Sequence, residues 1–334
     1  MKVLILAKDL YTETGGGQTS YRKIIDACPD VEFFYFEDIY SNERQVLPEN
    51  VKTIKLLCEQ SVEVLKPLLF PAHQYRALIE AHRFARSVKH RYFDIIEYPD
   101  YHTHGAYLRE ALEFNRVSYQ RIIVALHGNI STSMRYRWNW DSSTPLDIAG
   151  LEKMQVMKCD AAYGLSSRYI SETRDSKGLT QAVEIDAGCF VSDEFRRSED
   201  KKTEHLPSIY CIGRSERRKG NDLFIEIMRW MDATTYRDAM QIGPSVYIDD
   251  RGIWSDDRLA RMASMRDLDI PYCQLLAPKQ LAAIYNSSSI IIIPSRYDSF
   301  NLVALEAIAC GCVVAVSSAC GVCDYLDTYY PGIP

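Results

Sequence analysis

Two acidic residues near the end of the 334-residue chain flank a predicted helix start. Asp298 follows the apolar run 289–293, which predicts a buried strand, and Glu306 lies inside the next helical segment, 302–310. The backbone N–H groups at that start belong to Phe300, Asn301 and Leu302. Because such groups have no partner within the helix, they suit a phosphate, and the two carboxylates can reach opposite ends of a ligand anchored there. The alternative is a helix cap at Asp298 and a solvated Glu306.

A second charged segment follows the predicted strand 208–212 and leads into a helical segment, 221–231. It reads Gly213-Arg214-Ser-Glu-Arg-Arg-Lys219-Gly220. Arg214 and Lys219 lie five positions apart on a strand-to-helix loop, where an arginine fork and a lysine point charge can converge on a diphosphate. A solvated basic loop is the alternative interpretation.

These segments belong to a chain in which short apolar runs alternate with helix-length segments. Strands are predicted at 2–7, 93–97, 121–126, 161–165, 208–212, 241–243, 289–293 and 313–316. Such alternation predicts an α/β fold of parallel sheets with helices on both faces, whose ligands bind at the carboxyl ends of the strands.

The nearly all-polar stretch 196–205 suits a linker between domains. We therefore expect two doubly wound domains, 1–198 and 207–334, joined by residues 199–206. In the first domain, a glycine run that includes Gly16 and Gly17 follows the first strand, and His127 ends the strand 121–126. Taken alone, a histidine before a glycine fits a purely structural role as well as a place in a site.

In their order and spacing, the two C-terminal segments resemble the nucleotide-sugar site of glycosyltransferase family 4. The family hallmark is Pro-Ser-x-x-Glu-Gly-Phe-Gly…Glu-Ala-x-Ala-x-Gly, with seven residues between its two acids. The chain matches it at Pro294, Ser295, Phe300, Glu306, Ala307, Ala309 and Gly311. Asp298 replaces the first glutamate, and Ser299 and Asn301 replace the glycines. The family's Gly-Arg…Lys-Gly element matches at Gly213, Arg214, Lys219 and Gly220.

The resemblance implies the GT-B fold, with two facing Rossmann-like domains. It implies an enzyme that moves a sugar from a nucleotide-diphosphate sugar, with retained configuration and no further cofactor. The acceptor would be a glycan or glycolipid of cell-surface polysaccharide synthesis. Only 23 residues follow Gly311, fewer than is usual for the family, so we expect an incomplete C-terminal domain.

The same resemblance implies a role for each site residue. Arg214 and Lys219 would hold the diphosphate. Glu306 would accept from the ribose hydroxyls, and Asp298 would contact the donor sugar. The segment Ser299, Phe300, Asn301 and Leu302 would supply amides to the distal phosphate and the sugar. Gly16 and Gly17 would lie beside the phosphate and acceptor, His127 against the transferred sugar, and Leu275 and Leu276 at the base.

Composition and hydropathy limit the partners and the cellular location that we expect for this protein. The net charge of −6 does not favour binding to nucleic acid. No apolar run reaches the roughly 20 residues of a membrane-spanning helix, and the first run is too short for a signal peptide, so we expect a cytoplasmic protein. The segment 76–91 predicts an amphipathic helix with a basic outer side, which either faces water or makes peripheral contact with anionic lipid or a charged acceptor.

Two other functions share this scaffold: a nucleotide-sugar epimerase, and a catalytically silent GT-B subunit that acts as a binding partner. The presence of Arg214, Lys219 and Glu306 argues against a silent copy. The sole Asp-x-Asp candidate for a metal-bound diphosphate, Asp267-Leu-Asp269, has no predicted strand before it. We therefore expect transfer without a metal.

Overall fold

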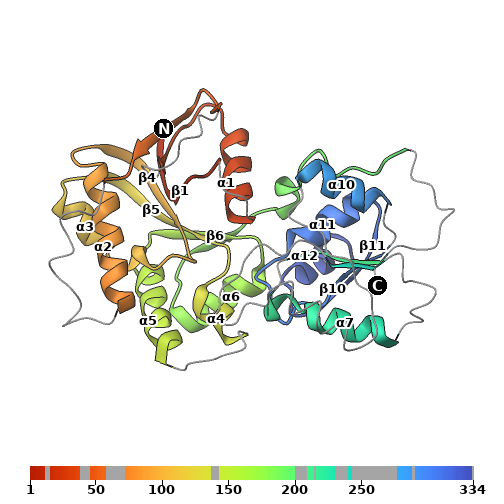
Figure 1. Cartoon of the computed structure of the whole chain (residues 1–334). Coiled ribbons are helices and arrows are strands. Elements are labelled where there is room, and N and C mark those ends of the chain that lie inside the picture. Colours follow the sequence, from red (N-terminus) through yellow and green to blue (C-terminus); the bar gives the residue numbers. More distant parts are fainter. Residues whose placement is uncertain are drawn as a thin grey trace. The chain divides into compact units, whose positions relative to one another are not determined.

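A computed structural model describes most of the chain as two compact units. It covers residues 1–11, 16–37, 46–57, 72–136, 143–199, 209–213, 216–230, 240–242, 277–287 and 290–332. The first unit comprises Met1–Thr132 and Asp141–Asp186, and the second comprises Ser133–Trp140 and Ala187–Pro334 (Figure 1).

The first unit is built on a parallel sheet with the strand order β3-β2-β1-β4-β5-β6-β7. Its strands are β1 (Lys2–Lys8), β2 (Glu32–Glu37), β3 (Val51–Lys55), β4 (Tyr92–Pro99), β5 (Ser118–Leu126), β6 (Ala161–Gly164) and β7 (Ala182–Glu184). Its helices are α1 (Gly16–Ala27), α2 (Ala72–Ser87), α3 (Leu108–Phe114), α5 (Ser143–Met157) and α6 (Ser167–Lys177), while α4 (Ile130–Arg135) crosses into the second unit.

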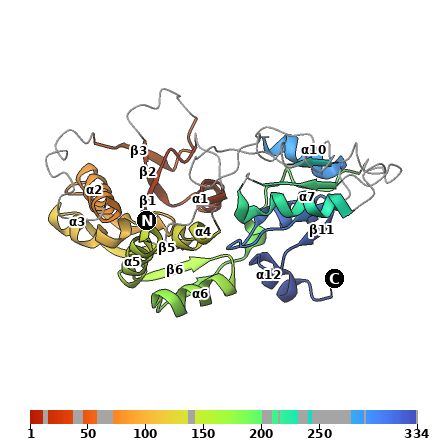
Figure 2. The same ribbon diagram turned by 60° about the horizontal axis from the view of Figure 1, so that its bottom comes forward.

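Both faces of this sheet are buried, as the apolar run at 2–7 predicts. The odd-numbered side chains of β1, such as Val3 and Ile5, pack with Tyr21 of α1. Because side chains alternate along a strand, Leu4 and Leu6 face the opposite side, and both are fully buried. Helices therefore cover both faces, and α1 and α2 can be located in Figure 2.

The order of the strands sets the place of a ligand site. From β1 the chain continues to β2 and β3 on one side of the sheet, and then crosses to β4 and the later strands on the other side. The connection therefore reverses between β1 and β4. In open α/β sheets, ligands bind outside the carboxyl ends of the strands at such a switch point.

The second unit contains a smaller parallel sheet with the order β11-β10-β8-β9. Its strands are β8 (Ile209–Cys211), β9 (Met240–Ile242), β10 (Ile290–Ile293) and β11 (Val313–Val316), and its helices are α7 (Asn221–Trp230), α10 (Pro278–Ser287), α11 (Leu302–Ala309) and α12 (Val322–Tyr329). The fold class predicted from the sequence, two parallel α/β domains, is confirmed.

The division between the units falls at residues 186 and 187, ahead of the expected boundary at 198. Ala187, Phe190 and Phe195 are buried, and the Phe195 ring lies 5.7 Å from that of Tyr285 in the second unit. Apolar packing therefore assigns this stretch to the second unit. Of the predicted linker 199–206, only Glu199 lies within the described residues.

The helix predicted at 76–91 corresponds to α2, which ends at Ser87, so Lys89 and Arg91 follow the helix and its basic outer side is smaller than expected. The Arg83 side chain is only 14% exposed: it donates to the carbonyl of Leu57 at 2.8 Å and lies 3.5 Å from Glu80. Arg86, Lys89 and Arg91 are exposed. Within the described part of the chain, no helix is long and apolar enough to cross a membrane.

Candidate functional site

The two charged loops of the second unit are joined at the carboxyl edge of its sheet. β8 and β10 are parallel neighbours, so the loops that follow them leave the sheet side by side. The backbone N–H of Arg296 donates to the carbonyl of Arg218 at 2.8 Å. Its guanidinium forms two hydrogen bonds to Asp222, at 2.6 and 2.7 Å. These contacts make the two loops a single structure, which we call the joined loops (216–222 and 294–301).

Gly220 is the closest point between the joined loops. Its φ is +74°, and a Cβ at this position would lie 1.9 Å from the carbonyl oxygen of Pro294. A side chain there would be strained by the backbone angle and would also collide with main chain. The glycine of the Lys-Gly pair is therefore a geometric requirement of this edge.

Lys219 and Asp298, which we expected to contact a ligand, pair with each other. Lys219 Nζ lies 2.5 Å from Asp298 Oδ2, Arg218 Nη1 lies 3.4 Å from Oδ1, and the Asn301 amide donates to Oδ2 at 2.9 Å. Burial alone would raise the pKa of Asp298, but the charges of Lys219 and Arg218 lower it to about 2. Asp298 is therefore ionised at neutral pH. Its carboxylate pairs with cations and does not cap the helix.

Helix α11 begins at Leu302, four residues after Asp298. Asn301 is the N-cap residue, with φ +92° and no side-chain capping bond. Asparagine tolerates this left-handed region better than most residues, which explains why it can stand where the family motif has a glycine. The buried Oδ1 of Asn301 has no hydrogen-bond partner within the described residues. The predicted residues Ser299, Phe300 and Leu302 flank it, and Phe300 is buried.

Glu306 lies in the second turn of α11 and is partly buried. The Tyr285 hydroxyl donates to its Oε2 at 3.4 Å. Burial raises the pKa of Glu306 to about 7. The alternative of a freely solvated Glu306 does not describe this environment, and the group changes charge near neutral pH.

Three predicted site residues lie outside the described residues: Arg214, Leu275 and Leu276. Their roles stay predictions. The Asp267 and Asp269 pair lies outside the described residues as well. Sequence reasoning missed Arg218, whose buried guanidinium also lies 3.2 Å from Glu216.

In the first unit, the loop that carries His127 is held by a buried carboxylate. Asp100 accepts the backbone N–H groups of His127 and Gly128, at 2.9 and 3.0 Å, and the hydroxyl of Tyr169. The His127 ring packs against Tyr21, with the centroids 5.5 Å apart. Burial lowers the pKa of His127 to about 4, so its imidazole is neutral at neutral pH.

The same loop is fixed at its far side by a second buried carboxylate. Glu152 of α5 accepts the backbone N–H of Ser131 at 2.9 Å and the ammonium of Lys177 at 2.7 Å. The side-chain amide of Asn129 donates a hydrogen bond to the hydroxyl of Tyr169 at 3.0 Å. Sequence reasoning missed these supporting residues. Asp100 carried one available signal, because it comes three residues after the predicted strand 93–97 and directly follows the observed β4, at the same sheet edge as His127.

Of the two glycines at the start of α1, Gly17 lies against Tyr101, whose ring is beside this histidine. A Cβ at Gly17 would lie 3.0 Å from the Tyr101 hydroxyl oxygen, whereas one at Gly16 would meet nothing within 4 Å. The Tyr101 ring centroid is 6.1 Å from that of His127. The structure therefore brings Gly17, Tyr101 and His127 together at the carboxyl edge of the larger sheet.

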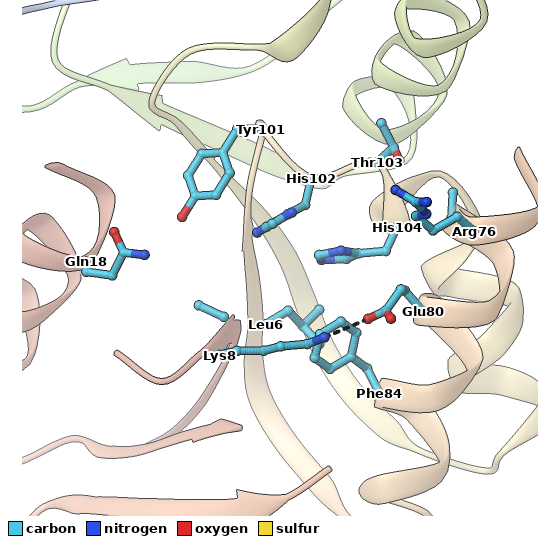
Figure 3. Close-up of a pocket in the computed structure, with 12 residues that line it drawn as sticks. Leu6, Lys8, Gln18, Arg76, Glu80, Phe84, Tyr101, His102, Thr103 and His104 are labelled. Carbon is cyan, nitrogen blue, oxygen red and sulfur yellow. Dashed lines mark ion pairs between the residues drawn. The ribbon is translucent and has the colours of Figure 1, made fainter. Parts of the chain in front are cut away.

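A cavity of about 280 Å³ opens at the same edge (Figure 3). It lies where β1 and β4 end, at the switch point of the sheet, and the facing wall is α2. Polar groups line much of it, among them Lys8, Arg76, Glu80, His102 and His104. A cavity with polar side chains at a switch point is typical of a ligand site.

Comparison with known proteins agrees with this geometry. A family model described as "Family 4 Glycosyltransferase in conflict systems" matches residues 164–332. A curated relative, D-inositol 3-phosphate glycosyltransferase of Corynebacterium kroppenstedtii, is 33% identical over 137 residues. That match covers 39% of this chain and 29% of the relative, so the chain matches less than a third of the relative's length.

Solved structures share the whole architecture. Sucrose-phosphate synthase from Thermosynechococcus elongatus has a TM-score of 0.73 and 17% identity, covering 96% of this chain and 82% of that one. HepE of Anabaena, in complex with UDP and glucose, has a TM-score of 0.65 and 14% identity, covering 97% and 82%. These likenesses show that the fold is GT-B, as expected from the sequence.

Proposed function

The chain belongs to glycosyltransferase family 4, in the group described for conflict systems, and we propose that it moves a sugar from a nucleotide-diphosphate sugar to a glycan or glycolipid acceptor. The observation that carries this proposal is the pairing of Lys219 with the ionised Asp298 on the joined loops. The pair supports the proposal because a cation and a carboxylate lie side by side at the carboxyl edge of the sheet, where a sugar diphosphate needs a partner for its phosphates and one for its hydroxyls.

In this proposal, each site residue contacts a different part of the donor. Lys219, together with Arg214, neutralises the diphosphate as negative charge develops on the leaving group. The N–H groups at the start of α11 add positive potential beside it. Asp298 binds a sugar hydroxyl, and Glu306 accepts hydrogen bonds from the ribose. In the first unit, the neutral imidazole of His127 contacts the transferred sugar.

A screen for the donor tests this proposal. HepE was solved with UDP and glucose, which supports a UDP-sugar as the first candidate, beside GDP-, ADP- and CMP-sugars. A ligand at a hundred times its dissociation constant stabilises the folded chain by roughly 2.7 kcal/mol, so the true donor should raise the melting temperature clearly. If no nucleotide sugar raises it, the donor site as assigned is wrong.

Donor affinity should depend on pH through Glu306. Because burial raises the pKa of Glu306 to about 7, its carboxylate is mostly protonated below that value and ionised above it. The ionised form is the better acceptor for ribose hydroxyls, so affinity should rise by about tenfold from about pH 6 to about pH 8. Calorimetric titration with the donor found in the screen measures this. Glu306→Gln should bind more weakly than the native chain at the higher pH and show a flat profile.

Stability should respond to the same group with the opposite slope. Glu306 keeps its ordinary pKa in the unfolded chain, so the folded chain binds the extra proton between that value and about 7. The free energy of unfolding should therefore fall as the pH rises across this window.

A pH-dependent donor affinity that persists in Glu306→Gln would assign the titration to another group.

We also propose that transfer needs no divalent metal and retains the anomeric configuration. Lys219, Arg214 and the start of α11 supply the positive potential that a metal supplies elsewhere, and the leaving phosphate helps to deprotonate the acceptor. Activity should survive EDTA, and proton NMR of fresh product from an α-linked donor should show an α linkage. Loss of activity in EDTA that manganese restores would refute the first claim, and a β product the second.

We propose that the protein is located in the cytoplasm, where nucleotide sugars would reach the joined loops. The acceptor would belong to cell-surface polysaccharide synthesis. The exposed cations Arg86, Lys89 and Arg91 form a surface available for peripheral contact with anionic lipid.

A further inference from the structure

The cavity at the switch point of the first unit carries an excess of positive charge. Glu80 is its acidic residue, and two cations already compensate it: Lys8 Nζ lies 3.2 Å from one carboxylate oxygen and Arg83 Nη1 lies 3.5 Å from the other. Arg76, one turn earlier on α2, also lines the cavity, and no described residue forms an ion pair with it. Lys8 and Arg83 therefore compensate the one carboxylate of the lining, and Arg76 adds a further cation to the cavity.

The two histidines on the opposite wall, His102 and His104, add no charge to the cavity at neutral pH. His102 is exposed to solvent, but desolvation by the residues packed around its ring, and then the charge of Lys8, lower its pKa to about 4. The same causes, with His102 itself, hold the pKa of His104 well below its usual range. Their rings stack with centroids 5.3 Å apart. Both imidazoles are neutral at neutral pH, so they offer hydrogen-bonding groups without contributing to the net charge.

The view into the cavity shows how these groups are arranged (Figure 3). His102 and His104 come from the loop after β4, and Arg76 and Glu80 project from α2 across from them. Lys8, at the end of β1, reaches Glu80 along the floor. A compact ligand in this space meets cations from two elements and neutral polar rings from a third.

We propose that this cavity binds a compact anionic group of the acceptor, a phosphate or a carboxylate, with Arg76 as its main partner. This inference rests on the proposed function, because the ligand of this cavity is an acceptor only if the chain is a transferase. Arg76 supplies a fork of donors that matches two oxygens of such a group, and Lys8 adds a second positive charge. Arg76 is exposed and forms no ion pair with a described residue, so an anionic group can pair with it, whereas a neutral polyol would gain hydrogen bonds alone.

Histidine NMR of the full-length chain tests the proposal locally. The chain has seven histidines, and an anion in the cavity should shift the imidazole resonances of His102 and His104, which the variants His102→Gln and His104→Gln assign. The probes are inorganic phosphate, glucose 6-phosphate, glucuronate and, as a neutral control, glucose. Because phosphate can also reach the joined loops of the other unit, the readout is these two resonances and not total heat of binding.

Arg76→Gln should weaken the response to the anion by about tenfold to a hundredfold. Arg91→Gln is the matched control, since it removes the same charge from an exposed side chain outside the cavity. A response to the phosphates only assigns a phosphorylated acceptor, and a response to glucuronate only assigns a uronic acid. Shifts caused equally by glucose, no shift with any anion, or an unchanged response in Arg76→Gln would each overturn the proposal.

The outcome is independent of the donor site. If the anion binds in the cavity while no nucleotide sugar stabilises the chain, the cavity is real and the transferase assignment fails. If a nucleotide sugar binds and the cavity ignores every anion, the transferase assignment stands and this inference fails.

Discussion

Replacing Gly220 by alanine should destabilise the second unit by about 3 kcal/mol or more. A left-handed backbone costs an alanine about 1–2 kcal/mol, and forced overpacking adds a similar amount. At φ +74° the new Cβ would lie 1.9 Å from the carbonyl oxygen of Pro294, so the joined loops must separate. Denaturant unfolding followed by tryptophan fluorescence measures this unit selectively, because all four tryptophans fall within its residue ranges.

Gly311→Ala is the matched control in the same unit. Its φ is +75°, almost the same, but its Cβ would meet only the flexible side chain of Arg197, at 3.2 Å. This variant should lose about 1–2 kcal/mol, the backbone cost alone. Equal losses in both variants would mean that the contact between Gly220 and Pro294 does not hold the loops together. Gly220→Ala should also lose donor binding, whereas Gly311→Ala should keep it.

Lys219→Ala should slow transfer by roughly a hundredfold to a thousandfold, since it removes a cation from the charge that develops on the leaving diphosphate. Among the described residues, the same change leaves the buried Asp298 with the weaker partners alone, Arg218 at 3.4 Å and the amide of Asn301. The variant should therefore be less stable as well as slower. Turnover and unfolding are measured on the same preparation, with Lys219→Arg as the charge-conserving comparison.

A double variant separates the two effects. In Lys219→Ala combined with Asp298→Asn, the buried carboxylate that lost its main partner is gone, and Arg218 keeps Glu216 at 3.2 Å, so stability should recover. Turnover should stay well below that of Asp298→Asn alone, which measures the loss of the sugar contact. Lys279→Ala, an exposed lysine of α10, is the control for loss of charge alone. If turnover recovers together with stability, Lys219 acts only as the structural partner of Asp298, and its role in catalysis is refuted.

The strands that carry the site could be predicted from the sequence. The runs that predict β10 and α11 lie within a residue or two of the observed Ile290–Ile293 and Leu302–Ala309. An apolar run of branched residues before a turn is a local signal, and burial on both faces makes it continuous. β7, with three mostly exposed residues, offers no such pattern. β2 is absent from the predicted strands, although its aromatic run, Glu32–Glu37, carries a clear signal.

The pairings inside the site could not be predicted from the sequence. Lys219 and Asp298 are 79 residues apart, and they meet because β8 and β10 happen to be neighbours in the sheet. Strand order is a property of the whole domain and leaves no mark on either loop. The same reason hides the support of His127, which depends on Tyr169 of α6 packing over Asp100.

The central claim is tested most directly by the products of one incubation. The chain is mixed with the nucleotide sugar that stabilises it and with candidate glycan and glycolipid acceptors, and the mixture is analysed by mass spectrometry. The account predicts free nucleotide diphosphate together with an acceptor heavier by one sugar residue, and neither product with Lys219→Ala at the same protein concentration. An isomerised nucleotide sugar would identify an epimerase, and an unchanged mixture would identify a silent subunit; either result contradicts the account.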